Sequence, residues 1–123
     1  MRSLIFPAAL CILLLALPAI GQVSEDEGRV FWRGIVDDRV HLVISGTSIE
    51  LRTVSGRETT DVSYSFTMPL PRADATVRVV KIEGRGTASV IQQPSAENGY
   101  QAIVEVYDRA SGARDYQLEI IWR

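Results

Sequence analysis

The chain has 123 residues, with 13 Lys and Arg against 15 Asp and Glu, and a formal net charge of −2. It contains one cysteine (Cys11) and one histidine (His41), so zinc and copper sites built from the usual Cys and His ligands are excluded. Charges of both signs are interspersed, which leaves no basic patch for nucleic acid or for an acidic membrane surface.

The N-terminus has the parts of a secretory signal peptide. Arg2 supplies a short positive region, residues 4–17 are apolar, and Ala19 and Gly21 are the small residues that precede a cleavage site. An uncleaved membrane anchor is the alternative, but the apolar run is shorter than the roughly 20 residues that span a bilayer. Cleavage before Gln22 therefore predicts an exported protein, periplasmic or extracellular, without stable membrane insertion.

Removal of the signal peptide (residues 1–21) leaves about 100 residues, close to the commonest size of one domain. Residues 22–27 are polar and acidic, and we interpret them as a solvated lead-in. Residues 28–123 are predicted to form one domain that has no cysteine, so its hydrophobic core alone must stabilise it.

From residue 28 onward, apolar and polar residues alternate in short segments bounded by turn residues. Such alternation is typical of half-buried antiparallel strands. We therefore expect an all-β antiparallel sandwich of about seven to eight strands, immunoglobulin-like or jelly-roll-like, with a compact barrel as the alternative. The predicted strands are residues 30–36, 39–45, 48–54, 61–66, 76–82, 87–93, 100–108 and 115–122.

The phase of the last two predicted strands assigns their aromatic residues to faces. Trp122 continues the alternation of the final strand and is expected to close one end of the core. Tyr107 is out of phase with its aliphatic neighbours and is expected on an outer face. The residues expected to share one face are Tyr100, Ala102, Val104 and Val106 in one strand, and Tyr116, Leu118, Ile120 and Trp122 in the other.

Two predicted connections are longer than the rest. Residues 67–75 contain two prolines, and residues 93–99 contain Pro94 and the turn dipeptide Asn98-Gly99. Because proline cannot donate to a strand ladder, the chain must leave its sheet there. We expect these segments to cross between the sheets and to be places where binding residues are found.

Asp37 and Asp38 follow one predicted strand and precede the next. Aspartate side chains stabilise tight turns by accepting hydrogen bonds from nearby backbone N–H groups, so we interpret the pair as a corner. The functional alternative is a calcium site completed by Asp108 or Asp115. Calcium requires six to eight oxygen ligands, and the sequence has no calcium-binding motif.

The other candidates are single residues. His41 lies mid-strand on the polar face, so we interpret it as a surface residue rather than a catalytic base. Arg85 stands between two glycines in a turn that is too short for a phosphate-binding loop. The candidates for a ligand or partner surface are Asp37, Asp38, Arg85 and Tyr107.

Several short motifs resemble those of small exported bacterial β-sandwich proteins without characterised function. The resemblance covers most of residues 28–122, implies export and a β-sandwich, and transfers no catalytic residue. The final acidic turn and strand also resemble immunoglobulin-like and accessory β-modules. The motifs are Trp32-Arg33-Gly34, Val36 to Val40, Gly84-Arg85-Gly86, Ile91 to Ser95, Asp108-Arg109, Gly112-Ala113 and Tyr116.

Two classes of function follow. The residue types favour a non-catalytic binding or scaffolding module of the cell envelope or extracellular space, with a protein or glycan partner and no cofactor. The alternative is a small hydrolase that cleaves envelope or extracellular glycans with paired carboxylates. A domain of this size offers little wall for the deep cleft that such an enzyme needs.

The predicted cleavage site can be tested directly. We expect the exported protein to begin at Gln22, because Ala19 and Gly21 satisfy the small-residue requirement of the signal peptidase. Intact-mass measurement of the exported protein checks this. A membrane-bound species that retains residues 4–17 would support the anchor instead.

Overall fold

The computed structural model describes residues 27–109 and 112–123. The predicted signal peptide and residues 22–26 of the predicted lead-in lie outside the described residues. The described residues form eight strands, whose bounds differ from the predicted ones by at most two residues. They are β2 (Gly28–Val36), β3 (Asp38–Ser45), β4 (Ser48–Ser55), β5 (Thr60–Phe66), β6 (Val77–Glu83), β7 (Thr87–Gln92), β8 (Ala102–Asp108) and β9 (Arg114–Trp122), with one 3-10 turn, η1 (Ala96–Asn98).

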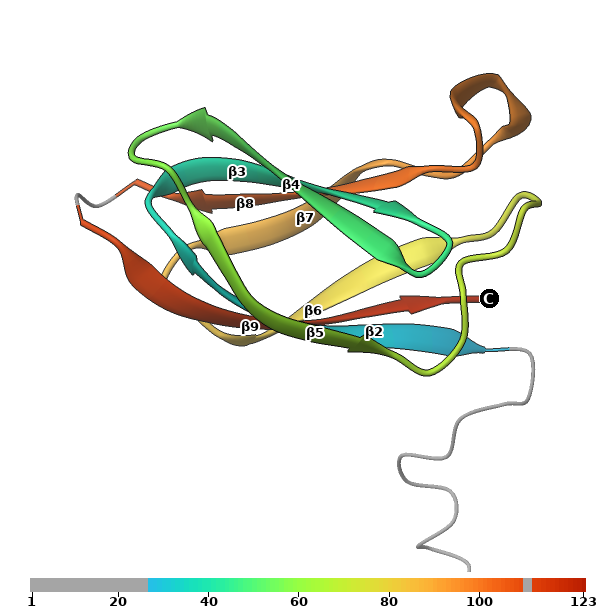
Figure 1. Cartoon of the computed structure of the whole chain (residues 1–123), viewed down its shortest axis with the longest axis horizontal. Helices are drawn as coiled ribbons and strands as arrows, with labels where there is room; N and C mark the ends of the chain where they lie inside the picture. The colour runs from blue at the N-terminus through green and yellow to red at the C-terminus, as the bar shows by residue number, and fades with distance from the viewer. Residues whose placement is uncertain (1–26, 110–111) are drawn as a thin grey trace, which may run out of the picture.

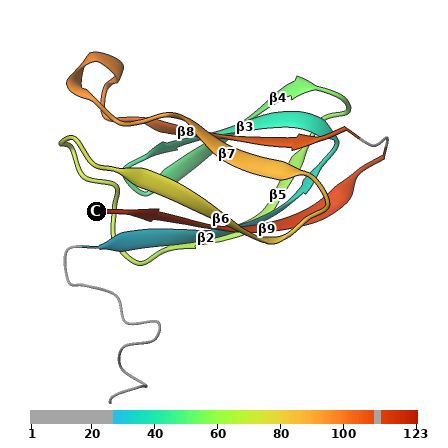
Figure 2. The same ribbon diagram turned by 180° about the vertical axis from the view of Figure 1, so that it is seen from behind.

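The strands form two four-stranded antiparallel sheets, ordered β5-β2-β9-β6 and β4-β3-β8-β7. Figures 1 and 2 show the sheets as two layers, seen from opposite sides. In each sheet the central pair joins a strand from the first half of the chain to one from the second, β2 to β9 and β3 to β8. The fold is all-β and sandwich-like, with two separate sheets in place of one closed barrel.

The hydrophobic core lies between the sheets, and the central strands supply most of it. Every second residue of β2 and of β8 is buried, as the alternation of side chains along a strand requires. The edge strands β5, β6 and β7 are much more exposed. The buried core consists of Val30, Trp32, Val36, Val40, Leu42, Ile44, Ile49, Leu70, Val77, Ala102, Val104, Val106, Tyr116, Leu118, Ile120 and Trp122.

Two glycines of β2 make room for the two tryptophans of the core. A side chain at Gly28 would collide with the Trp122 indole, and one at Gly34 would collide with the Trp32 ring. Each indole is 1% exposed. The Trp32 Nε1–H donates a hydrogen bond of 2.6 Å to the Asp61 carboxylate. The first strand therefore fixes the position of both large rings.

The two long connections do not cross between the sheets, contrary to the sequence expectation. Residues 67–76 join β5 to β6, which are the two edges of one sheet, and residues 93–101 join the neighbouring strands β7 and β8. The crossings are made by short turns, because stacked sheets are only about 10 Å apart. A segment that spans the width of a four-stranded sheet needs more residues than one that steps between layers.

Tyr100 lies outside β8, which begins at Ala102, so its predicted place in that strand is wrong. The turn around η1 continues through Tyr100, whose backbone N–H donates to the Ser95 carbonyl at 2.8 Å. The Asn98 side chain also accepts hydrogen bonds from the backbone N–H groups of Ser95 and Gln101. These local hydrogen bonds replace the strand ladder over residues 95–101.

The burial of Trp122 predicts a large effect on stability. Alternation along the last strand predicted that Trp122 faces the core, and this is confirmed. The indole is 1% exposed, and its ring centroid lies 6.0 Å from that of Phe66. Removing a buried aromatic costs on the order of 3–5 kcal/mol. We therefore expect Trp122→Ala to unfold or severely destabilise the protein, as measured by chemical denaturation.

Tyr107→Ala is the matched control, because Tyr107 is only partly buried and lies on an outer face. It should lower the free energy of unfolding much less than Trp122→Ala. If the Trp122→Ala variant were as stable as the wild-type protein, β9 would not contribute to the core as described.

Candidate functional site

The two ends of the sandwich differ in chemistry. One end carries the β2–β3 corner and the β4–β5, β6–β7 and β8–β9 turns, and it is rich in ion pairs. We call it the polar end. The other end carries the β3–β4 turn, residues 67–76 and residues 93–101, and it holds a cleft lined mainly by apolar groups. We call it the apolar end.

Asp37 lies at the polar end, where the chain turns from β2 in one sheet to β3 in the other. Its carboxylate accepts hydrogen bonds from the backbone N–H and the Nε–H of Arg57, at 3.0 and 3.2 Å. These bonds, the backbone one foremost, hold the pKa of Asp37 below its ordinary value. Asp38 has a φ of 73° and accepts a short hydrogen bond from the Ser55 hydroxyl. Both carboxylates therefore have protein partners in the corner.

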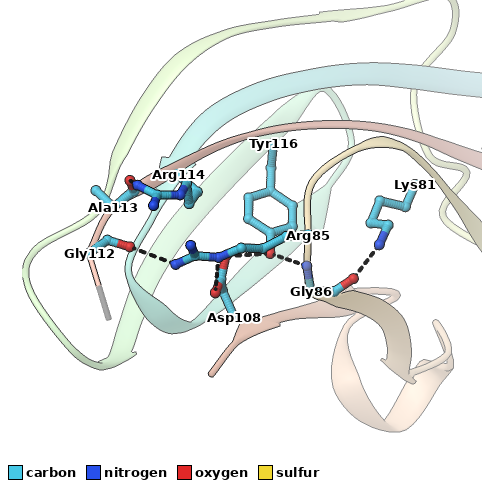
Figure 3. A network of polar contacts seen from close by, with 8 residues as sticks. All are labelled: Lys81, Arg85, Gly86, Asp108, Gly112, Ala113, Arg114 and Tyr116. Atoms are coloured by element: carbon cyan, nitrogen blue, oxygen red, sulfur yellow. Dashed lines mark hydrogen bonds and ion pairs between the residues drawn. The ribbon is translucent and has the colours of Figure 1, made fainter. Parts of the chain in front are cut away.

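Arg85 binds a buried carboxylate at the same end (Figure 3). Its Nε lies 2.7 and 2.8 Å from the two carboxylate oxygens of Asp108, which is 1% exposed. The Tyr116 hydroxyl donates to Asp108 at 2.8 Å and accepts from the Gly86 N–H at 2.7 Å. Burial, together with the bond to Asp108, raises the pKa of Tyr116 to about 12. This network closes the polar end of the core.

The sequence contained a signal for this network that our interpretation did not use. Asp108 lies on the same inward face of the strand as Val104 and Val106, so an acidic residue occupies a position that is usually apolar. A buried acid requires partners, because an unpaired charge is costly in the interior. Arg85 and Tyr116 come from other strands and turns, and the sequence does not indicate their pairing with Asp108.

Tyr107 lies on the outer face of the second sheet, as its phase predicted. The Arg39 guanidinium stacks over its ring at 4.2 Å, a cation–π contact. Arg39 and His41 both contact the Glu105 carboxylate, at 3.2 and 3.0 Å. The hydrogen bond with His41 is the main reason why the pKa of Glu105 is lowered. His41 therefore belongs to a surface ion-pair cluster.

The four candidate residues do not converge on one cleft. Arg85 and Tyr107 line a shallow cleft of about 260 Å³ beside Asp108. Asp37 and Asp38 lie on the adjacent corner, where Asp38 is the register partner of Asp108. The carboxylates of Asp37 and Asp38 accept from Arg57 and Ser55, and Arg85 donates to Asp108 and to the Gly112 carbonyl, so these charged groups are bound by the turns of this end.

The apolar end carries a larger open cleft of about 590 Å³, within the range of small ligand-binding sites. Three connections build it: the β3–β4 turn, residues 67–76 and the turn around η1. Figure 1 shows these segments at the same end of the molecule as the C-terminus. The cleft is lined by Ser45, Gly46, Met68, Pro69, Leu70, Pro71, Arg72, Gly99 and Tyr100.

The wall of this cleft is fixed to the fold. Leu70 is 2% exposed and belongs to the core, and its backbone N–H donates to the Gly46 carbonyl at 2.9 Å. Pro69 and Pro71 flank Leu70 and restrict the backbone on both sides. The segment that lines the cleft is therefore anchored at its centre and stiff around it.

Tyr100 also lines this cleft, and its backbone conformation is strained. Its φ is 59°, in the left-handed region that bulky residues rarely adopt, and such strain costs of order 1–3 kcal/mol. Gly99, the residue directly before Tyr100, also has a positive φ, of 73°. We did not place Tyr100 at a site from the sequence, because alternation alone assigned it to a strand.

Two further observations concern the described residues as a whole. Within residues 27–109 and 112–123, no group of three or more His, Cys, Asp or Glu side chains is placed to hold a metal ion. No helix in this part of the chain is long and apolar enough to cross a membrane. The apolar cleft offers contacts to aliphatic groups of a ligand, and the Tyr100 ring offers a surface on which a flat group of a ligand can stack.

The corner at Asp37 and Asp38 predicts that calcium does not stabilise the fold. A ligand present at one hundred times its Kd adds about 2.7 kcal/mol to the free energy of unfolding. We therefore expect coincident thermal melts with calcium and with chelator. A clear rise in Tm with calcium, abolished by Asp38→Asn, would show that the pair binds the ion.

The chain matches no protein-family model, and comparison with curated proteins and with solved structures finds no match. The resemblance to small exported bacterial proteins therefore stays an expectation from the sequence. Of the two clefts described here, the one at the apolar end is the larger, and Arg72 is the one charged residue in its lining.

Proposed function

We propose that the protein is an exported, non-catalytic β-sandwich module of the cell envelope or extracellular space that binds a partner through the cleft at its apolar end. Export rests on the predicted signal peptide, and an immunoglobulin-like or jelly-roll-like sandwich is part of the same proposal. The observation that carries the binding role is the cleft of about 590 Å³ built by three connections on a rigid pair of sheets.

The construction of the cleft supports binding. Loops that bind ligands are commonly held by a rigid scaffold, and here Leu70 ties the longest connection into the core. Backbone strain concentrates at functional sites when the surrounding structure holds it in place. The hydrogen bonds around Asn98 hold Tyr100 in its strained conformation.

The lining favours an apolar segment of a protein as the partner. Met68, Leu70 and two prolines offer apolar contact, and Tyr100 offers an aromatic ring. A glycan needs many hydrogen bonds to its hydroxyl groups, and the lining supplies few polar side chains beyond Ser45 and Arg72. A protein partner is therefore favoured over a glycan.

The carboxyl groups give less support to a hydrolase. A catalytic acid needs a raised pKa, whereas the pKa values of Asp37, Glu50 and Glu105 are all lowered. Each of these three groups is paired with an arginine or a histidine. Stabilised carboxylates of this kind are poor proton donors at neutral pH.

An apolar fluorescent probe tests the cleft. We expect anilinonaphthalene sulfonate to bind the folded protein and to shift the amide NMR signals of Met68, Leu70, Arg72 and residues 99–101. Tyr100→Gly should weaken binding, because it removes the aromatic wall. It should not destabilise the fold, because glycine adopts a φ near 59° at little cost.

Tyr107→Ala is the control, since it removes a tyrosine at the polar end and should leave probe binding unchanged. Shifts confined to the polar end, or unchanged binding by Tyr100→Gly, would contradict the proposed site. Hydrolysis of a glycan substrate by the purified protein would instead support the alternative function.

A further inference from the structure

The indole N–H of Trp122 is buried without a hydrogen-bond partner. The side chain is 1% exposed, and its Nε1 has no acceptor among the described residues. A buried donor without an acceptor costs free energy, so such groups are rare in folded proteins and call for an explanation. We propose that this N–H is a covered part of the cleft at the apolar end, and that it binds a carbonyl oxygen of the ligand when the Met68 side chain moves aside. The inference rests on the proposed function.

The other tryptophan of the core has the partner that Trp122 lacks. Trp32 is also 1% exposed, and its Nε1–H donates to the Asp61 carboxylate at 2.6 Å. Both rings belong to the same sheet, and each lies against a glycine of β2. The fold thus provides an acceptor for one of two equally buried indoles. The unpaired donor is a local feature of the apolar end, where β9 ends.

The space over Gly28 shows which side chain covers the N–H. A Cβ on Gly28 would lie 2.3 Å from Trp122 Nε1 and 2.5 Å from Met68 Cγ. The indole nitrogen and the Met68 side chain therefore meet in the room that the glycine leaves. Met68 is also a lining residue of the cleft of about 590 Å³. One side chain thus lies next to both the N–H and the cleft.

Trp122 also lines a smaller cleft, of about 330 Å³, but its N–H lies on the other side. Gly28 and Met68, the residues next to the N–H, do not line this smaller cleft. Its lining consists of Glu27, Thr76, Arg78, Ile121, Trp122 and Arg123. The N–H is therefore assigned to the cleft that Met68 lines.

The surroundings of Met68 let its side chain move while its backbone stays in place. Thr67 is bound to Arg29 twice: its N–H donates to the Arg29 carbonyl at 2.8 Å, and its hydroxyl oxygen accepts from the Arg29 N–H at 3.0 Å. Leu70, on the other side, belongs to the core. Methionine side chains are unbranched and adapt to different neighbours. A change of the Met68 rotamer is therefore enough to uncover the indole.

The chemistry of the donor indicates the chemistry of the ligand. An indole N–H donates and does not accept, so the ligand must supply an acceptor. Its surroundings are apolar, with Met68 over the nitrogen and Phe66 beside the ring. Burying a charged acceptor there would cost much more than burying a neutral one. The backbone carbonyl is the neutral acceptor that every residue of a protein segment carries. An apolar segment of a partner would thus present one carbonyl to Trp122.

Two small probes of the same ring shape test the inference. Cyclohexanone and methylenecyclohexane differ in having C=O or C=CH2 at one position, so only cyclohexanone can accept a hydrogen bond. Both should shift the amide NMR signals of Met68, Leu70 and Tyr100, which line the cleft. Only cyclohexanone should also move the Trp122 indole proton to higher chemical shift. The Trp32 indole signal is the internal control and should not move, because its N–H is bound to Asp61.

Two variants separate the N–H from its cover. Trp122→Phe keeps an aromatic ring and removes the N–H. The loss of one hydrogen bond should weaken cyclohexanone binding about threefold to tenfold and leave methylenecyclohexane binding unchanged. Met68→Ala removes the cover, so cyclohexanone should shift the Trp122 indole signal at lower concentration. Circular dichroism shows whether each variant folds, and the wild-type indole signal decides the outcome without them.

The results distinguish this inference from the proposed function. If cyclohexanone shifts the amides of the cleft and leaves the Trp122 indole signal in place, the inference is overturned and the proposed function stands. The same holds if both probes move the indole signal equally, or if folded Met68→Ala responds like the wild-type protein. If neither probe shifts the amides of the cleft, the proposed function and the inference are both overturned.

Discussion

The pairing of β2 with β9 is the interaction on which the rest of the structure depends. It runs without interruption from Gly28 opposite Trp122 to Val36 opposite Arg114, so the first and last described strands lie side by side. The pairing of β3 with β8 repeats this arrangement in the second sheet. Because these contacts join distant parts of the chain, the core forms only when nearly all of the domain is in place, which is typical of slowly folding β-proteins.

The positions of the other strands and of the connections follow from this central pairing. The strands in the middle of the chain, β4 to β7, become the edges, and all connections fall at the two ends of the molecule. The polar end is closed by Arg85, Asp108 and Tyr116, whose hydrogen bonds satisfy a carboxylate at the limit of the core. The apolar end has no such closure, and its connections instead form an open cleft. One end thus closes the core with a hydrogen-bond network, and the other end carries the cleft.

The sequence predicted the strands well because burial on one face imposes a period of two that is visible in the residues themselves. It did not predict strand order, and for this reason residues 67–75 and 93–99 were wrongly expected to cross between the sheets. Tyr100 was misplaced because the hydrogen bonds of Asn98 impose a turn where alternation indicated a strand. The cleft could not be predicted, since its side chains come from connections that are far apart in the chain. The inward phase of Asp108 could be read from the sequence, but its pairing with Arg85 and Tyr116 could not, because they come from the β6–β7 turn and from β9.

Hydrogen–deuterium exchange of the protein tests the central pairing most directly. Amides that are released only by global unfolding exchange last, whereas edges and connections exchange through local opening. The account predicts that β2, β3, β8 and β9 exchange last and together, well after β5 and residues 67–76. Exchange of β9 as fast as residues 67–76 would contradict the claim that pairing of the first and last strands holds the fold together.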